Sequence, residues 1–127
     1  MYRRFTRHYT RDEARELLPE IRGWLTRLGE LRERLDLYER QTKPLLSAGD
    51  DLGGNRVNHW VAEQSEFRKL LQEFESREIH LVDIERGQVH FPTLKGTKEA
   101  YLCWELRDDD VIYWRDLEEP SEGDSEE

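Results

Sequence analysis

Apolar residues recur at alternating spacings of four and three along residues 17–38, which predicts a helix that buries one stripe against a partner helix. Ala14, Leu18 and Leu25 widen this stripe in its first half only. We therefore expect the base of the helix to contact a further element, while its distal half contacts the partner helix alone. The stripe consists of Leu17, Ile21, Trp24, Leu28, Leu31, Leu35 and Tyr38.

Local signals mark the ends of this helix. Thr10 and Glu13 have the spacing of a capping box, in which each side chain accepts a hydrogen bond from the backbone N–H of the other residue. The helix should therefore begin there. Pro19 cannot donate a hydrogen bond to the preceding turn, so it predicts a kink nearby. Pro44 and the Gly- and Asp-rich residues 47–55 predict the end of the helix and a loop.

A second series of positions, again spaced by three and four residues, predicts another helix after this loop. Two long helices joined by one loop are expected to form an antiparallel hairpin. The spacing does not identify the partner, so the alternative is that the helices pair between two chains. The positions are Val57, Trp60, Gln64, Phe67, Leu71 and Phe74.

Beyond Glu78 the apolar period changes from about 3.5 to about 2 residues, which predicts strands. A two-residue turn at residues 86–87 would create a hairpin with one apolar face and one polar face. The pair on the polar face would be Asp83 and His90. In this register the apolar pairs are Ile84 with Val89 and Val82 with Phe91.

A second hairpin is predicted from residues 100–106 and 111–117, after a loop over residues 92–96 in which Pro92 closes the preceding strand. This hairpin is apolar on both faces, so the N-terminal segment, the helices or another subunit should cover the second face. Residues 2–9 alternate weakly and could add an edge strand. Alternation places Leu102, Trp104, Leu106, Val111 and Tyr113 on one side, and Tyr101, Cys103, Ile112 and Trp114 on the other.

The predicted fold is α+β: a long antiparallel helical hairpin, with its first helix kinked near Pro19, packed on a small antiparallel sheet of two hairpins. The chain has 127 residues and 35% hydrophobic content, which suits one domain, here residues 1–117. The last twelve residues hold seven acids and no bases, so they carry most of the net charge of −9. Residues 118–127 should form a disordered acidic tail.

Composition also narrows the classes of function. No run approaches the roughly 18 apolar residues of a membrane span, and no apolar signal core follows the first arginines, so we expect a soluble cytoplasmic protein. The single cysteine excludes an internal disulfide and zinc sites built on CxxC pairs. No phosphate loop, nucleophile elbow, HExxH motif or dinucleotide fingerprint occurs. We therefore expect no cofactor.

The N-terminal arm has arginines interleaved with aromatic residues, a composition that can grip single-stranded nucleic acid. The arm has only four positive charges, and the rest of the domain is neutral or acidic. This is a weak basic patch for binding a nucleic-acid backbone. We therefore do not expect nucleic acid as a partner. The arm consists of Arg3, Arg4, Arg7 and Arg11 with Tyr2, Phe5 and Tyr9.

The predicted Asp83–His90 pair is a candidate polar site, because a carboxylate orients an imidazole and raises its basicity. Two ligands are too few for a metal ion, so a structural contact between strands is the favoured interpretation. Cys103 lies between two apolar residues with no histidine predicted beside it, which favours a packed cysteine over a nucleophile.

Three segments resemble a family of bacterial and archaeal proteins known as domain of unknown function 2203. They are residues 85–92 (ERGQVHFP), residues 101–104 (YLCW) and Tyr113–Trp114, and the opening at residues 9–19 is also similar. The resemblance implies a shared fold and supplies no activity. The chain departs from the family pattern at two positions: Arg115 stands where a histidine is usual, and His90 stands where an acid is usual. We therefore include Arg115 in the candidate polar site. Any activity that depends on those two positions would be lost in this member.

We interpret the sequence as a non-enzymatic protein–protein interaction and oligomerisation module, expected to be a homodimer without a bound metal. The expected interface is the apolar set Tyr101, Cys103, Ile112 and Trp114. The alternative is a small metal-assisted hydrolase that uses Asp83 and His90 with Glu105 or Asp109. The lack of a third well-placed ligand weighs against this alternative.

Overall fold

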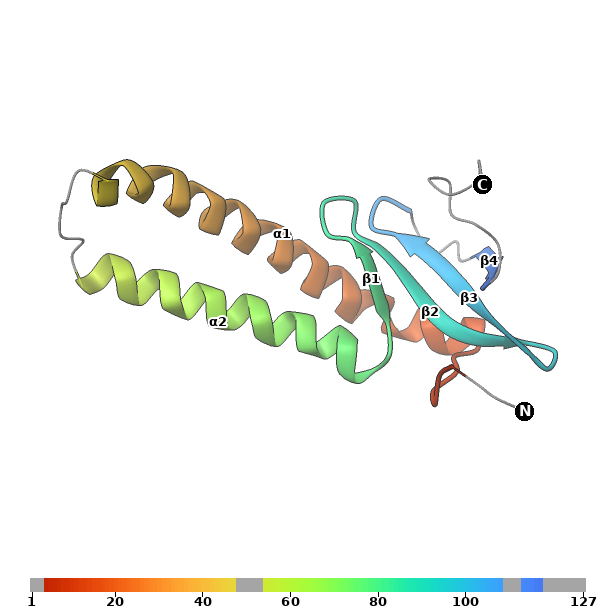
Figure 1. The fold of residues 1–127 in the computed structure, drawn as a ribbon. Helices are drawn as coiled ribbons and strands as arrows, with labels where there is room; N and C mark the ends of the chain where they lie inside the picture. Colours follow the sequence, from red (N-terminus) through yellow and green to blue (C-terminus); the bar gives the residue numbers. More distant parts are fainter. Residues whose placement is uncertain (1–3, 48–53, 109–112, 118–127) are drawn as a thin grey trace.

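A computed structural model describes residues 4–47, 54–108 and 113–117, and within these ranges it has two helices and four strands. The helices project to one side of a small sheet (Figure 1). This arrangement confirms the predicted α+β class. The elements are α1 (Arg11–Ser47), α2 (Gly54–Ser76), β1 (His80–Asp83), β2 (Gln88–Lys95), β3 (Lys98–Glu105) and β4 (Tyr113–Asp116).

The predicted capping box is present at the start of α1. Glu13 N donates to Thr10 Oγ1 over 3.1 Å, and Thr10 N donates to Glu13 Oε1 over 2.9 Å. The helix continues through Pro19 and Pro44 to Ser47, so it ends within the region where Pro44 and residues 47–55 predicted its end. A proline disturbs the turn that precedes it, and the residues after it can still continue the helix. The kink near Pro19 stays a prediction.

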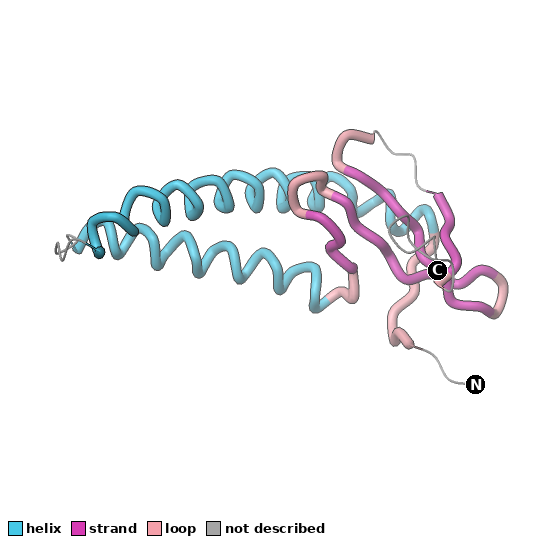
Figure 2. Tube along the Cα trace, turned by 45° about the horizontal axis from the view of Figure 1, so that its top comes forward, coloured by secondary structure: helices cyan, strands magenta, loops and turns pink. Residues whose placement is uncertain are grey.

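The base of α1 packs against the sheet, as the widened stripe predicted. Ala14, Leu18 and Leu25 are at most 4% exposed and belong to one core with side chains of β2 and β3. Figure 2 shows the first turns of α1 lying behind the strands, while the rest of the helix extends away from them. The sheet contributes Val89, Phe91, Leu102 and Trp104 to this core.

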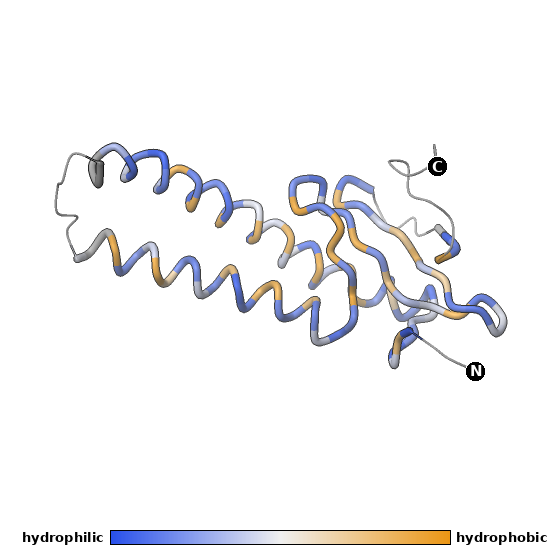
Figure 3. Tube along the Cα trace, viewed as in Figure 1, coloured by the Kyte–Doolittle hydropathy of each residue, from blue (hydrophilic) through white to orange (hydrophobic). Residues whose placement is uncertain are grey.

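α1 and α2 form an antiparallel hairpin within the chain, joined by residues 48–53, which lie outside the described ranges. The Arg27 guanidinium donates to the Glu66 carboxylate over 2.7 and 3.0 Å. Further toward the tip, the rings of Tyr38 and Trp60 stack with their centroids 5.4 Å apart. Apolar positions recur along both helices and alternate with polar ones along the strands (Figure 3).

The strands form one antiparallel sheet with the order β1-β2-β3-β4. The two expected hairpins are therefore part of a continuous meander. Lys95 pairs with Lys98 across Gly96 and Thr97, in the region where a loop was expected. Gly96 has φ 69°, and a positive φ is what a two-residue hairpin turn requires of its central residues.

Pro92 lies inside β2, so the prediction that it closes the strand is wrong. Leu106 N donates to Gly87 O over 3.0 Å, and hydrogen-bonded pairs alternate along an antiparallel ladder. Pro92 opposite Tyr101 is therefore a non-hydrogen-bonded pair, so the missing N–H costs no bond to β3. On the other edge of β2, the Pro92 carbonyl accepts a hydrogen bond from Tyr9 N over 2.7 Å.

The register between β1 and β2 also differs from the prediction. His80 lies opposite His90, and Asp83 lies opposite Gln88, so the predicted pairing of Asp83 with His90 is wrong. The turn between these strands spans residues 84–87 instead of two residues. Asp83 stabilises the longer turn, because its Oδ1 accepts a hydrogen bond from Arg86 N over 3.2 Å.

Candidate functional site

The face of the sheet turned away from the helices carries the polar candidates. His80, His90 and Cys103 occupy one row across β1, β2 and β3, and Tyr101 lies opposite Arg115 in a neighbouring row of β3 and β4. We call these five residues the outer-face cluster. The structure brings His90 and Arg115 into this cluster and leaves Asp83 at the turn beside Arg86.

His90 is a buried, neutral histidine. It is 8% exposed, and its ring centroid lies 4.9 Å from that of Tyr101 and 6.2 Å from that of His80. Burial, together with smaller electrostatic contributions from His80 and Arg115, lowers the pKa of His90 to about 4. Its Nε2 is buried without a hydrogen-bond partner in the described part of the chain. With such a pKa, His90 cannot serve as a general acid near neutral pH.

Cys103 lies directly opposite His90, so the expectation that no histidine stands beside it is wrong. The two residues form a non-hydrogen-bonded pair, in which side chains approach closely. Cys103 is completely buried, and the neutral imidazole of His90 supplies no positive charge to stabilise a thiolate. The pairing therefore still favours a packed cysteine.

Of the carboxylates expected to complete a metal site, the structure describes Glu105, which is paired with two arginines. Glu105 is 7% exposed, and its oxygens lie 2.6 Å from Arg86 Nη2 and 3.3 Å from Arg107 Nε. Asp109 lies outside the described residues. Across the described ranges no group of three His, Cys, Asp or Glu side chains could hold a metal ion.

The predicted apolar side of the last hairpin is divided between two faces. Trp114 lies opposite Leu102, so it shares the side of that core residue, and its grouping with Tyr101 and Cys103 is wrong. Trp114 is 40% exposed, with the Arg11 guanidinium 6.0 Å from its ring centroid. Ile112 lies outside the described ranges. The register between β3 and β4 depends on the length of the connection between them. Alternation within each strand does not fix this register.

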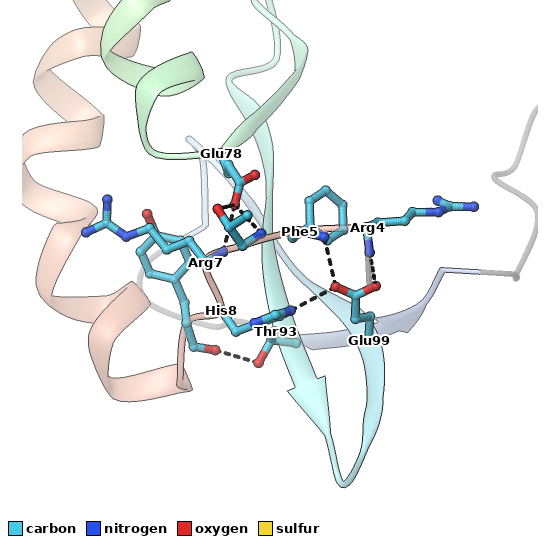
Figure 4. Close-up of polar contacts among 9 residues, drawn as sticks. Arg4, Phe5, Arg7, His8, Glu78, Thr93 and Glu99 are labelled. Carbon is cyan, nitrogen blue, oxygen red and sulfur yellow. Dashed lines mark hydrogen bonds and ion pairs between the residues drawn. The ribbon is translucent and has the colours of Figure 1, made fainter. Parts of the chain in front are cut away.

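A polar cluster that the sequence does not predict holds the N-terminal segment. The Glu99 carboxylate accepts hydrogen bonds from Arg4 N over 2.7 Å and from Phe5 N over 3.0 Å, and it pairs with His8 Nε2 at 2.8 Å (Figure 4). Burial by itself would raise the pKa of Glu99, but these three contacts lower it to about 2. We call residues 4–9 the N-terminal strap.

A second carboxylate holds the middle of the strap. Glu78 Oε1 accepts hydrogen bonds from Thr6 N over 3.0 Å and from Arg7 N over 2.8 Å. Tyr9 then enters the core, and its hydroxyl donates to Arg77 O over 2.7 Å. The strap is not the edge strand that was considered, because the structure assigns no strand to residues 4–10. Backbone amides bind these carboxylates, so residue types alone gave no signal for the cluster.

Described side chains of α2 line a hollow at each end of the helix. The tip hollow, of about 550 Å³, lies between the distal halves of the two helices, and the α2–β1 hollow, of about 370 Å³, lies near the sheet. The tip hollow is lined by Leu35, Asp36, Tyr38, Glu39, Thr42, Lys43, Val57, Trp60 and Gln64. The α2–β1 hollow is lined by Arg68, Leu71, Gln72, Phe74, Glu75, Ile79, His80 and Leu81.

Comparison with known proteins identifies the family of this chain. Among the described residues, neither helix is sufficiently long and apolar to span a membrane. No curated protein and no solved structure matches the chain. The sequence profile of the uncharacterised conserved proteins of domain of unknown function 2203 matches residues 7–124. Since this match covers most of the 127 residues, the chain belongs to the domain of unknown function 2203 family.

Proposed function

We propose that this protein is a non-enzymatic oligomerisation module that forms a homodimer through its helical hairpin. The observation that carries the proposal is the incomplete burial of the seam, by which we mean the apolar side chains between α1 and α2. Among the described side chains of α2, none before Phe74 is fully buried, although the apolar stripe begins at Val57. On α1, Thr42 is the single buried side chain described after Leu31.

A seam of this kind is incompletely covered by one partner helix. Trp60, Phe67 and Leu71 are only partly buried, whereas such residues become fully buried when two hairpins associate into a four-helix bundle. The tip hollow offers further apolar surface to a partner, because Leu35, Val57 and Trp60 line it. Extended apolar surface on a small domain is typical of an interface.

The outer-face cluster favours this proposal over catalysis. The hydrolase alternative needs Asp83 beside His90, and the β1–β2 register separates them. His90 is neutral at physiological pH, and Cys103 is completely buried. His90 therefore cannot donate a proton as a general acid near neutral pH, and burial disfavours a Cys103 thiolate.

Sedimentation velocity of the full chain, from about 1 to 100 µM, tests the proposal, because this range covers weak and moderate association. One chain has a mass of 15.3 kDa, and we expect twice that mass at the upper end of the range. A mass of one chain at every concentration would refute the homodimer.

A further inference from the structure

The homodimer can use either helix, and we infer that α2 of each copy packs antiparallel against α2 of the other. This inference rests on the proposed function and adds the geometry of its interface. Two hairpins joined through α2 form a four-helix bundle, in which each hairpin covers the seam that the other leaves incompletely buried.

One face of α2 borders both hollows. Six positions recur at spacings of four and three residues, so they lie on the same side of the helix. In the first half of this line Val57 and Gln64 border the tip hollow, and in the second half Arg68, Leu71 and Glu75 border the α2–β1 hollow. A helix laid along the line would contact both. We call it the α2 line: Val57, Val61, Gln64, Arg68, Leu71 and Glu75.

The α2 line is complementary to itself. Val61 is an apolar side chain with 51% exposure, and Leu71, ten residues further along, lines the α2–β1 hollow. A two-fold axis at their midpoint, residue 66, would place each of these positions about 7.5 Å from the axis along the helix. Val61 of each copy would then enter the hollow of the other, where Phe74 and Ile79 supply apolar surface.

The charges on the line are compatible with this antiparallel register. Arg68 would face the neutral Gln64 of the second copy, and Glu75 would face its Val57. No two like charges of the α2 line would lie directly opposite each other. The antiparallel orientation also places opposite ends of the two helix dipoles side by side.

The size of the contact predicts the strength of the dimer. The α2 line spans about 27 Å, and a contact about 10 Å wide would bury roughly 600 Å² over both copies. The tip of α1 and strand β1 border the two hollows and would add a similar area. The total of about 1,200 Å² lies at the lower limit of stable interfaces. We therefore expect a dissociation constant in the micromolar range.

The first experiment measures dimer dissociation of full-length variants by sedimentation. Val61→Glu places a carboxylate against the apolar side chains Leu71, Phe74 and Ile79 in the α2–β1 hollow of the second copy, so it should raise the dissociation constant at least about tenfold. Leu37→Glu is the matched control, because Leu37 is 46% exposed and lines neither hollow. It should change the constant less than about twofold. Circular dichroism checks that both variants keep their helices.

Disulfide formation then tests the register in a Cys103→Ala background. Chains with Gln64→Cys and chains with Arg68→Cys are mixed and oxidised. The inferred register predicts that the mixed disulfide forms faster than either symmetric one, because positions 64 and 68 face each other across the axis. Equal rates for all three products would overturn the register.

The outcomes separate the two proposals. A wild-type dimer that Val61→Glu leaves intact, or that Leu37→Glu disrupts equally, would overturn the α2 interface while the oligomerisation module stands. A wild-type chain that stays monomeric up to about 100 µM would overturn both.

Discussion

Replacing His90 should change how the stability of the protein depends on pH. The buried imidazole has a pKa of about 4, compared with an ordinary value of 6.5. Between these values the unfolded chain binds a proton at this position and the folded protein does not. The contribution of a neutral His90 is therefore fully present above pH 6.5 and is lost as the pH falls from 6.5 toward 4.

The magnitude follows from the difference between the two pKa values. Each pKa unit corresponds to about 1.4 kcal/mol, so acidification from pH 6.5 to 4 should cost about 3 kcal/mol of unfolding free energy through His90. The side chain is 8% exposed, so solvent screens this effect only weakly. His90→Gln removes the titrating group, and the variant should lose this part of the pH dependence.

Urea unfolding at pH values between about 4 and 7 provides the assay. The difference between wild-type and His90→Gln free energies should shift by about 3 kcal/mol across this range. His59→Gln, which removes an exposed histidine of α2, controls for the loss of a histidine elsewhere. Parallel pH profiles for wild type and His90→Gln would refute the reasoning, as would a native His90 that titrates near pH 6.5 by NMR.

Three further predictions concern the core, the strap and the turns. Leu28 is fully buried, so Leu28→Ala should lower the free energy of unfolding by about 2–5 kcal/mol in denaturant melts, and a loss below about 0.5 kcal/mol would contradict its central position. Glu99 has a pKa lowered to about 2, so its contribution to stability is present above its ordinary value of 4.5 and is lost as the pH falls toward 2. Glu99→Gln should speed proteolysis within the strap at neutral pH and bring wild type and variant together in acid, and equal rates at neutral pH would show that this carboxylate does not hold the strap. Gly87→Ala should cost more than Gly96→Ala in urea melts, because both glycines have positive φ but an added Cβ at Gly87 would lie 2.5 Å from Leu106 Cβ while Gly96 has open space. A similar loss of about 1 kcal/mol for both would mean that backbone strain alone sets the cost.

Local rules in the sequence determined the helices and the class of fold. The capping box of Thr10 and Glu13 and the recurring apolar stripe depend on contacts within a few residues, so spacing alone reveals them. The added apolar positions Ala14, Leu18 and Leu25 also revealed that the base of α1 packs against something other than α2. The change of period after Glu78 similarly located the sheet.

Only the tertiary structure decided which strand residues face each other. The β1–β2 turn has four residues, and this length moved His80, instead of Asp83, opposite His90. Alternation specifies the side of a strand, whereas turn length and packing specify its register. For the same reason, the neighbours of Cys103 and Trp114 were not predictable from their own strands.

The N-terminal strap and the strand position of Pro92 are the clearest cases of structure that the sequence did not reveal. Pro92 fits within β2 because its missing N–H points away from β3, toward the edge where Tyr9 binds its carbonyl. Glu78 and Glu99 bind backbone amides that are more than seventy residues away in the chain. Every residue except proline carries such an amide, so residue type cannot identify the donor. The three-dimensional path of the chain alone brings donor and acceptor together.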